Sequence, residues 1–361
     1  MSHFSCTIVA LLLLCSSVCS ASPLRVIRDG EETKLSHTVT DMLAAPGPGL
    51  KSSAVWYGRM GANLQRDGEG RLYCMGNSLG PNLVRSNDEG RTWRATELSL
   101  PGFSLFIAFA VLPDDTLLAL YEPVGSSHRA VWCARSSDGG DTWRARRLRL
   151  DLGAHRFVGG KDANIVVRGD GALVVPLRLW DSESAKGSDE ALAHAFVSDD
   201  AGRTWQRRGV IAEGVRHVRM TQTKTGSLLA CSYDANVKRV VLSESTDAAK
   251  TWTPPRTMEL SESGPADLTR LADGTLILSW LFQYNPEFEV RTRGVRAVVS
   301  RDGGKTWADD LYIVAQWGPG GYGGYLPGHL AMDGGDLLTA RVTKSGSGLR
   351  MQAVRWNPIK D

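Results

Sequence analysis

The amino-acid sequence predicts an all-β fold, a six-bladed β-propeller with four antiparallel strands in each blade. An octapeptide of the form Ser-x-Asp-x-Gly-x-Thr-Trp recurs along the chain at intervals of roughly 50 residues, a spacing typical of propellers and other arrays. Short turns followed by apolar strand-forming runs recur with the same period. No segment of any length shows the apolar period of an amphipathic helix. Together these patterns predict one large propeller domain.

The octapeptide is predicted to form a β-hairpin turn. Its Asp can accept hydrogen bonds from nearby backbone N–H groups, and its Gly can adopt the positive φ that other residues avoid. Its Trp offers a large apolar face to bury at the edge of the turn. Ala249 stands in the Gly position of one copy, where left-handed backbone should cost about 1 kcal/mol. The five copies are Ser86–Trp93, Ser136–Trp143, Ser198–Trp205, Ser245–Trp252 and Ser300–Trp307.

A second repeated turn sets the number of blades at six. We interpret each copy as the hairpin between the two inner strands of one blade. The last blade has no octapeptide, because the chain ends after Met351–Pro358. We therefore expect the N-terminal segment Leu24–Arg28 to supply its outer strand and close the ring. These turns begin at Asp67, Asp114, Asp170, Thr225, Asp273 and Asp333.

The two kinds of turn are expected on the same face of the propeller. In a four-stranded blade, the first-to-second and third-to-fourth connections lie on one side. The opposite side, which we call the open face, carries the starts of the first strands and the ends of the second strands. Loops there can vary without disturbing the turns, so a ligand site is expected on the open face near the axis.

The octapeptide resembles the Asp box, or BNR repeat, of sialidases (neuraminidases) and related propeller proteins. This resemblance implies a sialidase-like propeller and an exo-α-sialidase type of glycoside hydrolase. In that family arginines hold the carboxylate of the substrate. A Tyr usually activated by a Glu is the nucleophile, and an Asp is the acid/base group.

The resemblance places two arginines on substrate. Arg59 corresponds to the arginine at the start of the family's first blade, although the Pro of that family motif is absent. The fifth-blade arginine corresponds to Arg293 or Arg291, with Arg296 as a further alternative.

Three family positions of the remaining blades can also be matched. The nucleophile corresponds to Tyr325, with Tyr322 as the alternative. His217 stands where the family has its Glu, and Tyr233 stands where it has a further arginine. The first-blade loop Met75–Pro81 contains no Asp for the acid/base role.

The expected topology nominates three more residues on the open face. Asp162 is the candidate acid/base group, and Arg341 is a candidate for holding an acidic group of the substrate. Trp180 is a candidate for stacking on a sugar ring, with pinning of its own loop as the alternative.

These residues leave three functions open. The first is a secreted exo-α-sialidase, with Tyr325, Asp162 and His217 as catalytic residues. The second is a non-catalytic carbohydrate-binding propeller, favoured by the changed Glu, Arg and Asp positions. The third is another carbohydrate-active enzyme, such as a polysaccharide lyase or a different glycosidase, with His217 and Tyr325 or Tyr233 in acid/base roles.

The N-terminus is expected to direct secretion. The apolar run Ile8–Leu14 has the length of a signal-peptide core, so residues 1–21 are predicted to be removed after Ser20 or Ala21. An uncleaved anchor is the alternative. The mature domain then spans residues 22–361. We expect it to be secreted or otherwise outside the cytoplasm, which in a bacterium means the periplasm. We expect no membrane contact after cleavage.

Composition points away from several other classes of protein. The formal net charge of +3 is too slight to suggest nucleic-acid binding. No cofactor or metal motif is found, so we expect none, with a glycan or sialoglycoconjugate as partner and a monomeric chain. Three cysteines would remain in the mature chain, and they are expected to be small buried core residues. They are Cys74, Cys133 and Cys231.

Overall fold

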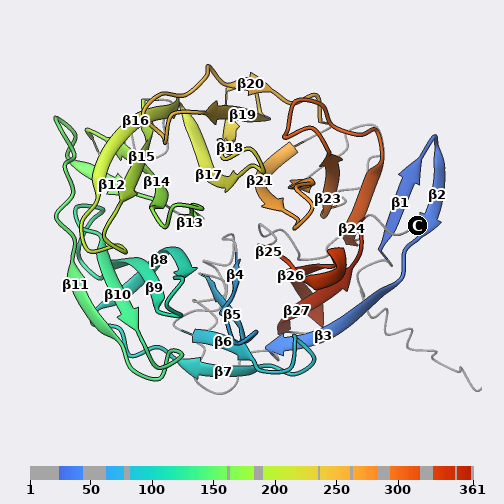
Figure 1. The fold of residues 1–361 in the computed structure, drawn as a ribbon, viewed down its shortest axis with the longest axis horizontal. Coiled ribbons are helices and arrows are strands. Elements are labelled where there is room, and N and C mark those ends of the chain that lie inside the picture. Colours follow the sequence, from blue (N-terminus) through green and yellow to red (C-terminus); the bar gives the residue numbers. More distant parts are fainter. Residues whose placement is uncertain are drawn as a thin grey trace, which may run out of the picture.

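The computed structural model describes residues 24–43, 62–76, 82–160, 163–182, 190–234, 236–260, 263–282, 293–317, 328–345 and 348–358. Their strands form six antiparallel sheets arranged as blades around a central axis (Figure 1). The predicted propeller, with four strands in each blade, is therefore confirmed. Among the described residues, the one helical element is the 3₁₀ turn Asp333–Gly335, and no helix is long and apolar enough to cross a membrane.

Blades 1 to 3 are built from consecutive strands, which follow one another from the axis outward. Blade 1 contains β4 (Ala62–Arg66), β5 (Leu72–Gly76), β6 (Asn82–Ser86) and β7 (Arg94–Glu97). Blade 2 contains β8 (Phe103–Val111), β9 (Leu117–Pro123), β10 (Trp132–Ser136) and β11 (Arg144–Arg147). In blade 3, β12 (Phe157–Gly159) and β13 (Val166–Val167) share the inner position, followed by β14 (Leu173–Trp180), β15 (Leu192–Ser198) and β16 (Gln206–Glu213).

Blades 4 to 6 repeat this order. Blade 4 contains β17 (Val215–Gln222), β18 (Leu228–Asp234), β19 (Arg239–Ser245) and β20 (Arg256–Thr257). Blade 5 contains β21 (Ser263–Arg270), β22 (Leu276–Phe282), β23 (Arg293–Ser300) and β24 (Leu311–Trp317). Blade 6 contains β25 (Gly328–Ala331), β26 (Leu337–Ser345) and β27 (Gly348–Trp356), with β3 (His37–Leu43) as its outer strand.

The ring is closed by β3, so the prediction that Leu24–Arg28 closes it is wrong. β3 pairs antiparallel with β27, and the blue β3 lies beside the red β27 in Figure 1. β1 (Arg25–Arg28) pairs instead with β24 and with β2 (Glu31–Lys34), which extends the sheet of blade 5 to six strands. β3 offers seven residues against the four of β1, and its Met42 packs into the core shared by blades 6 and 1. The longer strand therefore forms the longer ladder with β27.

Each octapeptide forms the expected self-contained turn, as the first copy illustrates. Ser86 Oγ donates to Asp88 Oδ1 at 2.8 Å, and Thr92 donates to the same carboxylate from its backbone N (2.8 Å) and its hydroxyl (2.6 Å). Gly90 N donates to Ser86 Oγ at 2.8 Å. These bonds, chiefly from Thr92, lower the pKa of Asp88 to about 2. The turn thus depends on a charged carboxylate.

Ala249 adopts the left-handed backbone expected from its place in the fourth copy. Its φ is 67°, and its N–H still donates to Ser245 Oγ at 3.0 Å. The hydrogen-bond pattern of the turn is therefore kept. The cost of having Ala in place of Gly is backbone strain.

The octapeptide turns also join neighbouring blades. Thr40 Oγ1 donates to Gly90 O at 2.9 Å, which ties the closing strand to the turn of blade 1. Arginines play the same part elsewhere, because a guanidinium reaches across the gap to a turn carbonyl. These bonds are Arg85 to Gly139 O, Arg135 to Ala201 O and Arg256 to Gly304 O.

Apolar side chains fill the spaces between successive blades, and this is where the predicted core lies. Cys74, Cys133 and Cys231 are buried there with free thiols, as predicted. Burial raises the pKa of the Cys133 thiol to about 11, so this thiol is protonated at neutral pH.

Candidate functional site

The inner strand of blade 4 is irregular where it begins on the open face. Arg216 pairs with Tyr233, but the next recorded pair joins Arg219 to Cys231, so β17 carries an extra residue there. His217, inside this bulge, has a φ of 53°. Bulges re-aim side chains and are common beside active sites. The ladder is therefore interrupted after Arg216, where the bulge can re-aim the side chains at the start of β17.

Two arginines and a tyrosine lie at or near this bulge, within range of one another's charges. Arg178 lies near the open-face end of β14, where it pairs with Gly159. Burial lowers the pKa of Arg178 to about 10, and the positive charge of Arg216 acts in the same direction. Burial raises the pKa of the Tyr233 hydroxyl, against the opposing charge of Arg216. Partly buried guanidinium groups of this kind favour a bound anion, above all a planar carboxylate.

A buried polar network near the axis connects blades 4, 5 and 6. Arg219 Nη1 lies 3.4 Å from Asp267 Oδ1, and both side chains are almost fully buried. Burial raises the pKa of Asp267 to about 6, while Arg219 acts in the opposite direction. The His329 ring lies 2.6 Å from Ser279 Oγ and 2.8 Å from Thr339 Oγ1. Burial lowers the pKa of His329 to about 3, so its ring is neutral and its hydroxyl partners satisfy it.

The comparisons with known proteins concern the family and the fold of the chain. The family model for the BNR repeat-like domain matches residues 107–319. The chain belongs to this family. No curated protein matches the chain.

Solved structures place this BNR propeller among sialidase-like folds. The NanB sialidase of Streptococcus pneumoniae has a TM-score of 0.62 and 12% identity, over 88% of this chain and 71% of that one. A Hadza microbial sialidase has a TM-score of 0.58 and 18% identity, over 81% of this chain and 64% of its own length. A protein of unknown function from Dyadobacter fermentans has a TM-score of 0.65 and 18% identity, over 83% of this chain and 95% of its own length. At these identities the likeness shows the fold.

Several predicted site residues lie outside the described part of the chain. They are Arg59, Asp162 and Tyr325, together with the alternatives Tyr322 and Arg291. Arg293 begins β23, where its backbone pairs with Trp317. The roles given to these residues stay predictions.

His217 and Tyr233 are brought together at the bulge of β17, beside Arg216. Sequence reasoning assigns no role to Arg178 or Arg216. The pattern of apolar and polar residues does not reveal a bulge, and the bulge decides what the start of β17 presents. The sequence offers one indication of this site: Arg178 lies near the end of the second strand of its blade, and such strand ends are expected on the open face.

Trp180 and Arg341 are both buried. The Trp180 ring is stacked on Phe157, with centroids 6.0 Å apart. Arg341 donates to Val314 O at 3.3 Å and to Gln352 Oε1 at 3.4 Å, and burial lowers its pKa to about 10. These contacts pin the end of β14 and tie blade 6 to the outer strand of blade 5.

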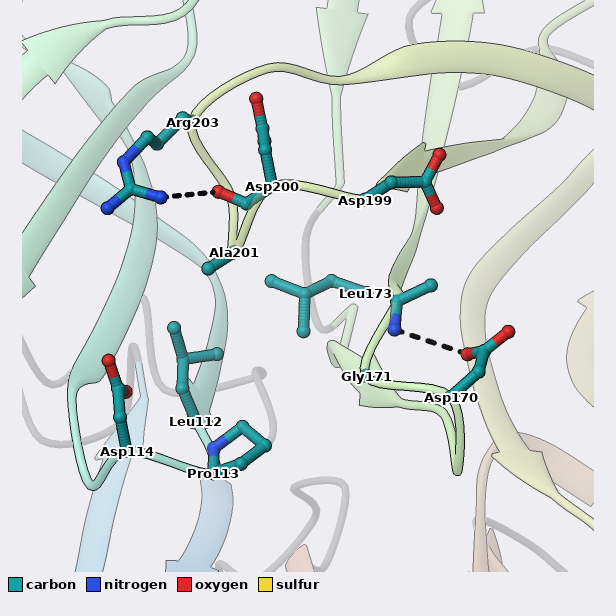
Figure 2. A pocket seen from close by; sticks show the side chains of 11 residues that line it. Leu112, Pro113, Asp114, Asp170, Gly171, Leu173, Asp199, Asp200, Ala201 and Arg203 are labelled. Atoms are coloured by element: carbon teal, nitrogen blue, oxygen red, sulfur yellow. Dashed lines mark hydrogen bonds between the residues drawn. The ribbon is translucent and has the colours of Figure 1, made fainter.

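A hollow of about 470 Å³ lies on the other face, beside the octapeptide turn of blade 3 (Figure 2). Its carboxylates are engaged in the turns themselves. Asp170 accepts from Ala172 N at 3.2 Å, and Asp200 accepts from the Thr204 hydroxyl at 2.7 Å. Figure 2 shows the Arg203 side chain bonded to the Asp200 carbonyl. The hollow is lined by turns of blades 2 and 3 and therefore lies in the seam between them.

Proposed function

We propose that this BNR propeller binds an acidic glycan on its open face and removes the terminal acidic sugar, as an exo-α-sialidase type of glycoside hydrolase. The observation that carries the proposal is the pairing of Arg216 with Tyr233 at the bulged start of β17, close enough to Arg178 for the charge of Arg216 to act on it. A related fold, the Trypanosoma rangeli sialidase, is known in complex with sialic acid, at a TM-score of 0.52 and 14% identity. A sialic acid carries the carboxylate that such a site suits.

The arginines supply binding and orientation in this proposal. Arg178 and Arg216 hold the carboxylate of the sugar in charge-assisted hydrogen bonds. Partial burial strengthens these bonds, because fewer water molecules compete for the same donors. The carboxylate is held next to the anomeric carbon that carries it, so the clamp also places the reacting atom.

The proposed chemistry uses residues of three blades. Tyr325 attacks the anomeric carbon while His217 accepts its proton, in the position where the family has its Glu. The bond to the leaving oxygen breaks as Asp162 donates a proton to it. Water then attacks the anomeric carbon and gives a proton to Asp162, while the carbon–Tyr325 bond breaks and His217 returns its proton to the Tyr oxygen; this releases the free sugar and restores all three groups.

We further propose that the protein acts outside the cytoplasm as a monomer. The apolar run Ile8–Leu14 supports export through a leader of residues 1–21. Such a location would bring the propeller to the glycans of surfaces and secretions.

Hydrolysis of a fluorogenic α-sialoside by the full chain tests the proposal. Arg216→Ala should lower kcat/KM about 10- to 100-fold, because a charge-assisted contact to the substrate is lost. Arg203→Ala, on the opposite face, is the matched control and should keep the parent rate. Absence of hydrolysis by the parent chain would remove the enzymatic proposal.

A non-catalytic glycan-binding propeller is the second candidate. It is favoured by His217 and Tyr233, which occupy the places of a catalytic Glu and a substrate-binding arginine in the family. Saturable binding of a sialyl-oligosaccharide without turnover, lost in Arg216→Ala, would select this candidate over the first.

A further inference from the structure

The outer strand of blade 2 carries a short, strongly basic segment. It consists of β11 and the two residues that follow, and all of its arginines are exposed. None of them makes an ion pair with a carboxylate in the part of the chain that the structure describes. Four like charges within six residues repel one another, so an anionic partner would stabilise them. The four arginines are Arg144, Arg146, Arg147 and Arg149.

This basic segment accounts for the excess positive charge of the whole chain. The chain contains 42 Lys and Arg against 39 Asp and Glu, and without the four arginines only 38 basic residues would remain. The outer strands of the neighbouring blades mix both signs of charge. β7 carries Arg94 and Glu97, and β16 carries two arginines and Glu213. Charge of either sign protects an exposed strand edge from pairing with other chains, so the single sign on β11 calls for a further reason.

The basic segment forms a narrow row at the rim of the propeller. β11 is the last strand of its sheet and lies at the outer edge of the ring (Figure 1). Arg146 lies opposite Cys133, which belongs to the core between blades 2 and 3. Arg147 lies opposite Trp132, which packs against the core between blades 1 and 2. Residues directly opposite one another share one face of a sheet, so the arginines project to both sides of the edge, along at most about 17 Å.

Contacts with blade 3 hold one end of a guanidinium row in place. The Arg146 side chain donates a hydrogen bond to the Arg203 carbonyl, in the octapeptide turn of blade 3. Arg203 is itself exposed, and its side chain donates to the Asp200 carbonyl at 3.2 Å. Both guanidinium groups are thus bonded to neutral carbonyl oxygens, which leave their positive charges uncompensated. A bound anion would meet donors that are already ordered, which lowers the entropic cost of binding.

The number and the arrangement of these charges favour a linear polyanion. A guanidinium group binds an oxyanion through two parallel hydrogen bonds. A protein that binds DNA tightly makes about 6–10 phosphate contacts, more than this row offers. A stable membrane contact adds buried apolar side chains to basic ones, and none of the exposed large apolar residues in the described chain lies on β11. A highly sulfated polysaccharide has closely spaced anionic groups along a single chain, which matches the row.

We propose that the basic segment of blade 2 is a second binding surface, which holds the propeller on a highly sulfated polysaccharide. Arg144, Arg147 and Arg149 bind its sulfate groups, beside the anchored Arg146. This surface lies at the rim, whereas the arginine site begins at β17, the innermost strand of blade 4. Attachment at the rim therefore leaves the open face accessible. The proposal does not depend on whether the open face binds or hydrolyses an acidic sugar.

Binding of the full chain to immobilised heparin, a highly sulfated polysaccharide, tests the position of the surface. The measurement is made at about 0.15 M NaCl, where distant charges are screened. A rim variant that combines Arg144→Gln, Arg147→Gln and Arg149→Gln should weaken binding about 10- to 100-fold, because three cations close to the polyanion are lost. Arg146 is left in place, since it ties blade 2 to blade 3.

A control variant removes the same charge elsewhere on the molecule. It combines Lys238→Gln, Lys250→Gln and Arg301→Gln, three exposed residues of blades 4 and 5. Its affinity for heparin should stay within about 3-fold of the parent value, because charges more than a Debye length from the polymer contribute little. All the replaced side chains are exposed, so both variants should keep the urea unfolding midpoint of the parent chain. Equal losses of affinity in the two variants, or no binding by the parent chain, would overturn the proposal.

The chemical class of the partner is tested with the parent chain alone. Heparin from which the sulfate groups have been removed keeps its carboxylates, and the affinity of the chain for it should be lower by about 10-fold or more. Double-stranded DNA and vesicles containing phosphatidylserine should bind more weakly than heparin at the same salt concentration. Undiminished binding to the desulfated polymer, or tighter binding to DNA or to the vesicles, would overturn the assignment to a sulfated polysaccharide.

Discussion

His329 should make the stability of the propeller depend on pH in a defined direction. Its ring is 7% exposed and bonded to two hydroxyls, and burial lowers its pKa to about 3. An unfolded His has a pKa of about 6.5, so the unfolded chain takes up this proton first as the pH falls. The stabilisation is therefore complete above pH 6.5 and is lost as the pH falls from 6.5 toward 3.

The expected loss follows from the difference between the two pKa values. Between pH 7.5 and pH 5, the unfolded state gains about 2 kcal/mol from protonation of this one ring, while the folded state gains almost nothing. His329→Gln keeps hydrogen-bonding capacity toward Ser279 and Thr339 but does not titrate. The free energy of unfolding of this variant should therefore change with pH by about 2 kcal/mol less than that of the parent chain.

Urea unfolding of the full chain at pH 7.5 and pH 5.0 measures this difference. Comparing the two pH values within each protein cancels the contribution of every carboxylate that both proteins share. His37→Gln is the control, because His37 is only partly buried and bonds to the Leu35 carbonyl. An equal loss of stability in the parent and in His329→Gln would refute the assignment of a buried neutral ring.

Two further predictions concern the Gly position of the octapeptide turns. Ala249→Gly should raise the free energy of unfolding by about 0.5–1 kcal/mol, measured by urea unfolding, because φ is 67° there; an unchanged value would show that the turn carries no strain. Gly304→Ala should lower the free energy of unfolding by about 2 kcal/mol or more, since φ is 91° and the new Cβ would lie 2.6 Å from Leu229 Cδ2. In the same assay, a loss below 0.5 kcal/mol would contradict this.

The blades could be predicted from the sequence because their turns are local. The bonds that close the octapeptide turn join residues within a few positions, as Ser86, Asp88 and Thr92 show, so the motif determines its own structure. The closing strand could not be chosen in the same way. Leu24–Arg28 and His37–Leu43 both pair as strands, and the choice between them depends on how each fits the end of a ring built from distant residues.

The candidate site was only partly predictable for a similar reason. The open face and the importance of His217 and Tyr233 follow from topology and family resemblance. The bulge that brings Arg216 beside Arg178 is a change of register, which leaves no mark in the pattern of apolar and polar residues.

The most direct measurement of the central claim is the affinity of the full chain for free sialic acid and for its methyl ester, by isothermal titration calorimetry. The two ligands differ in the charge of a single carboxylate. The acid should bind at least about 10-fold more tightly than the ester, and Arg216→Ala should remove that preference. Equal affinity for acid and ester in the parent chain would contradict an arginine site for the acidic group on the open face.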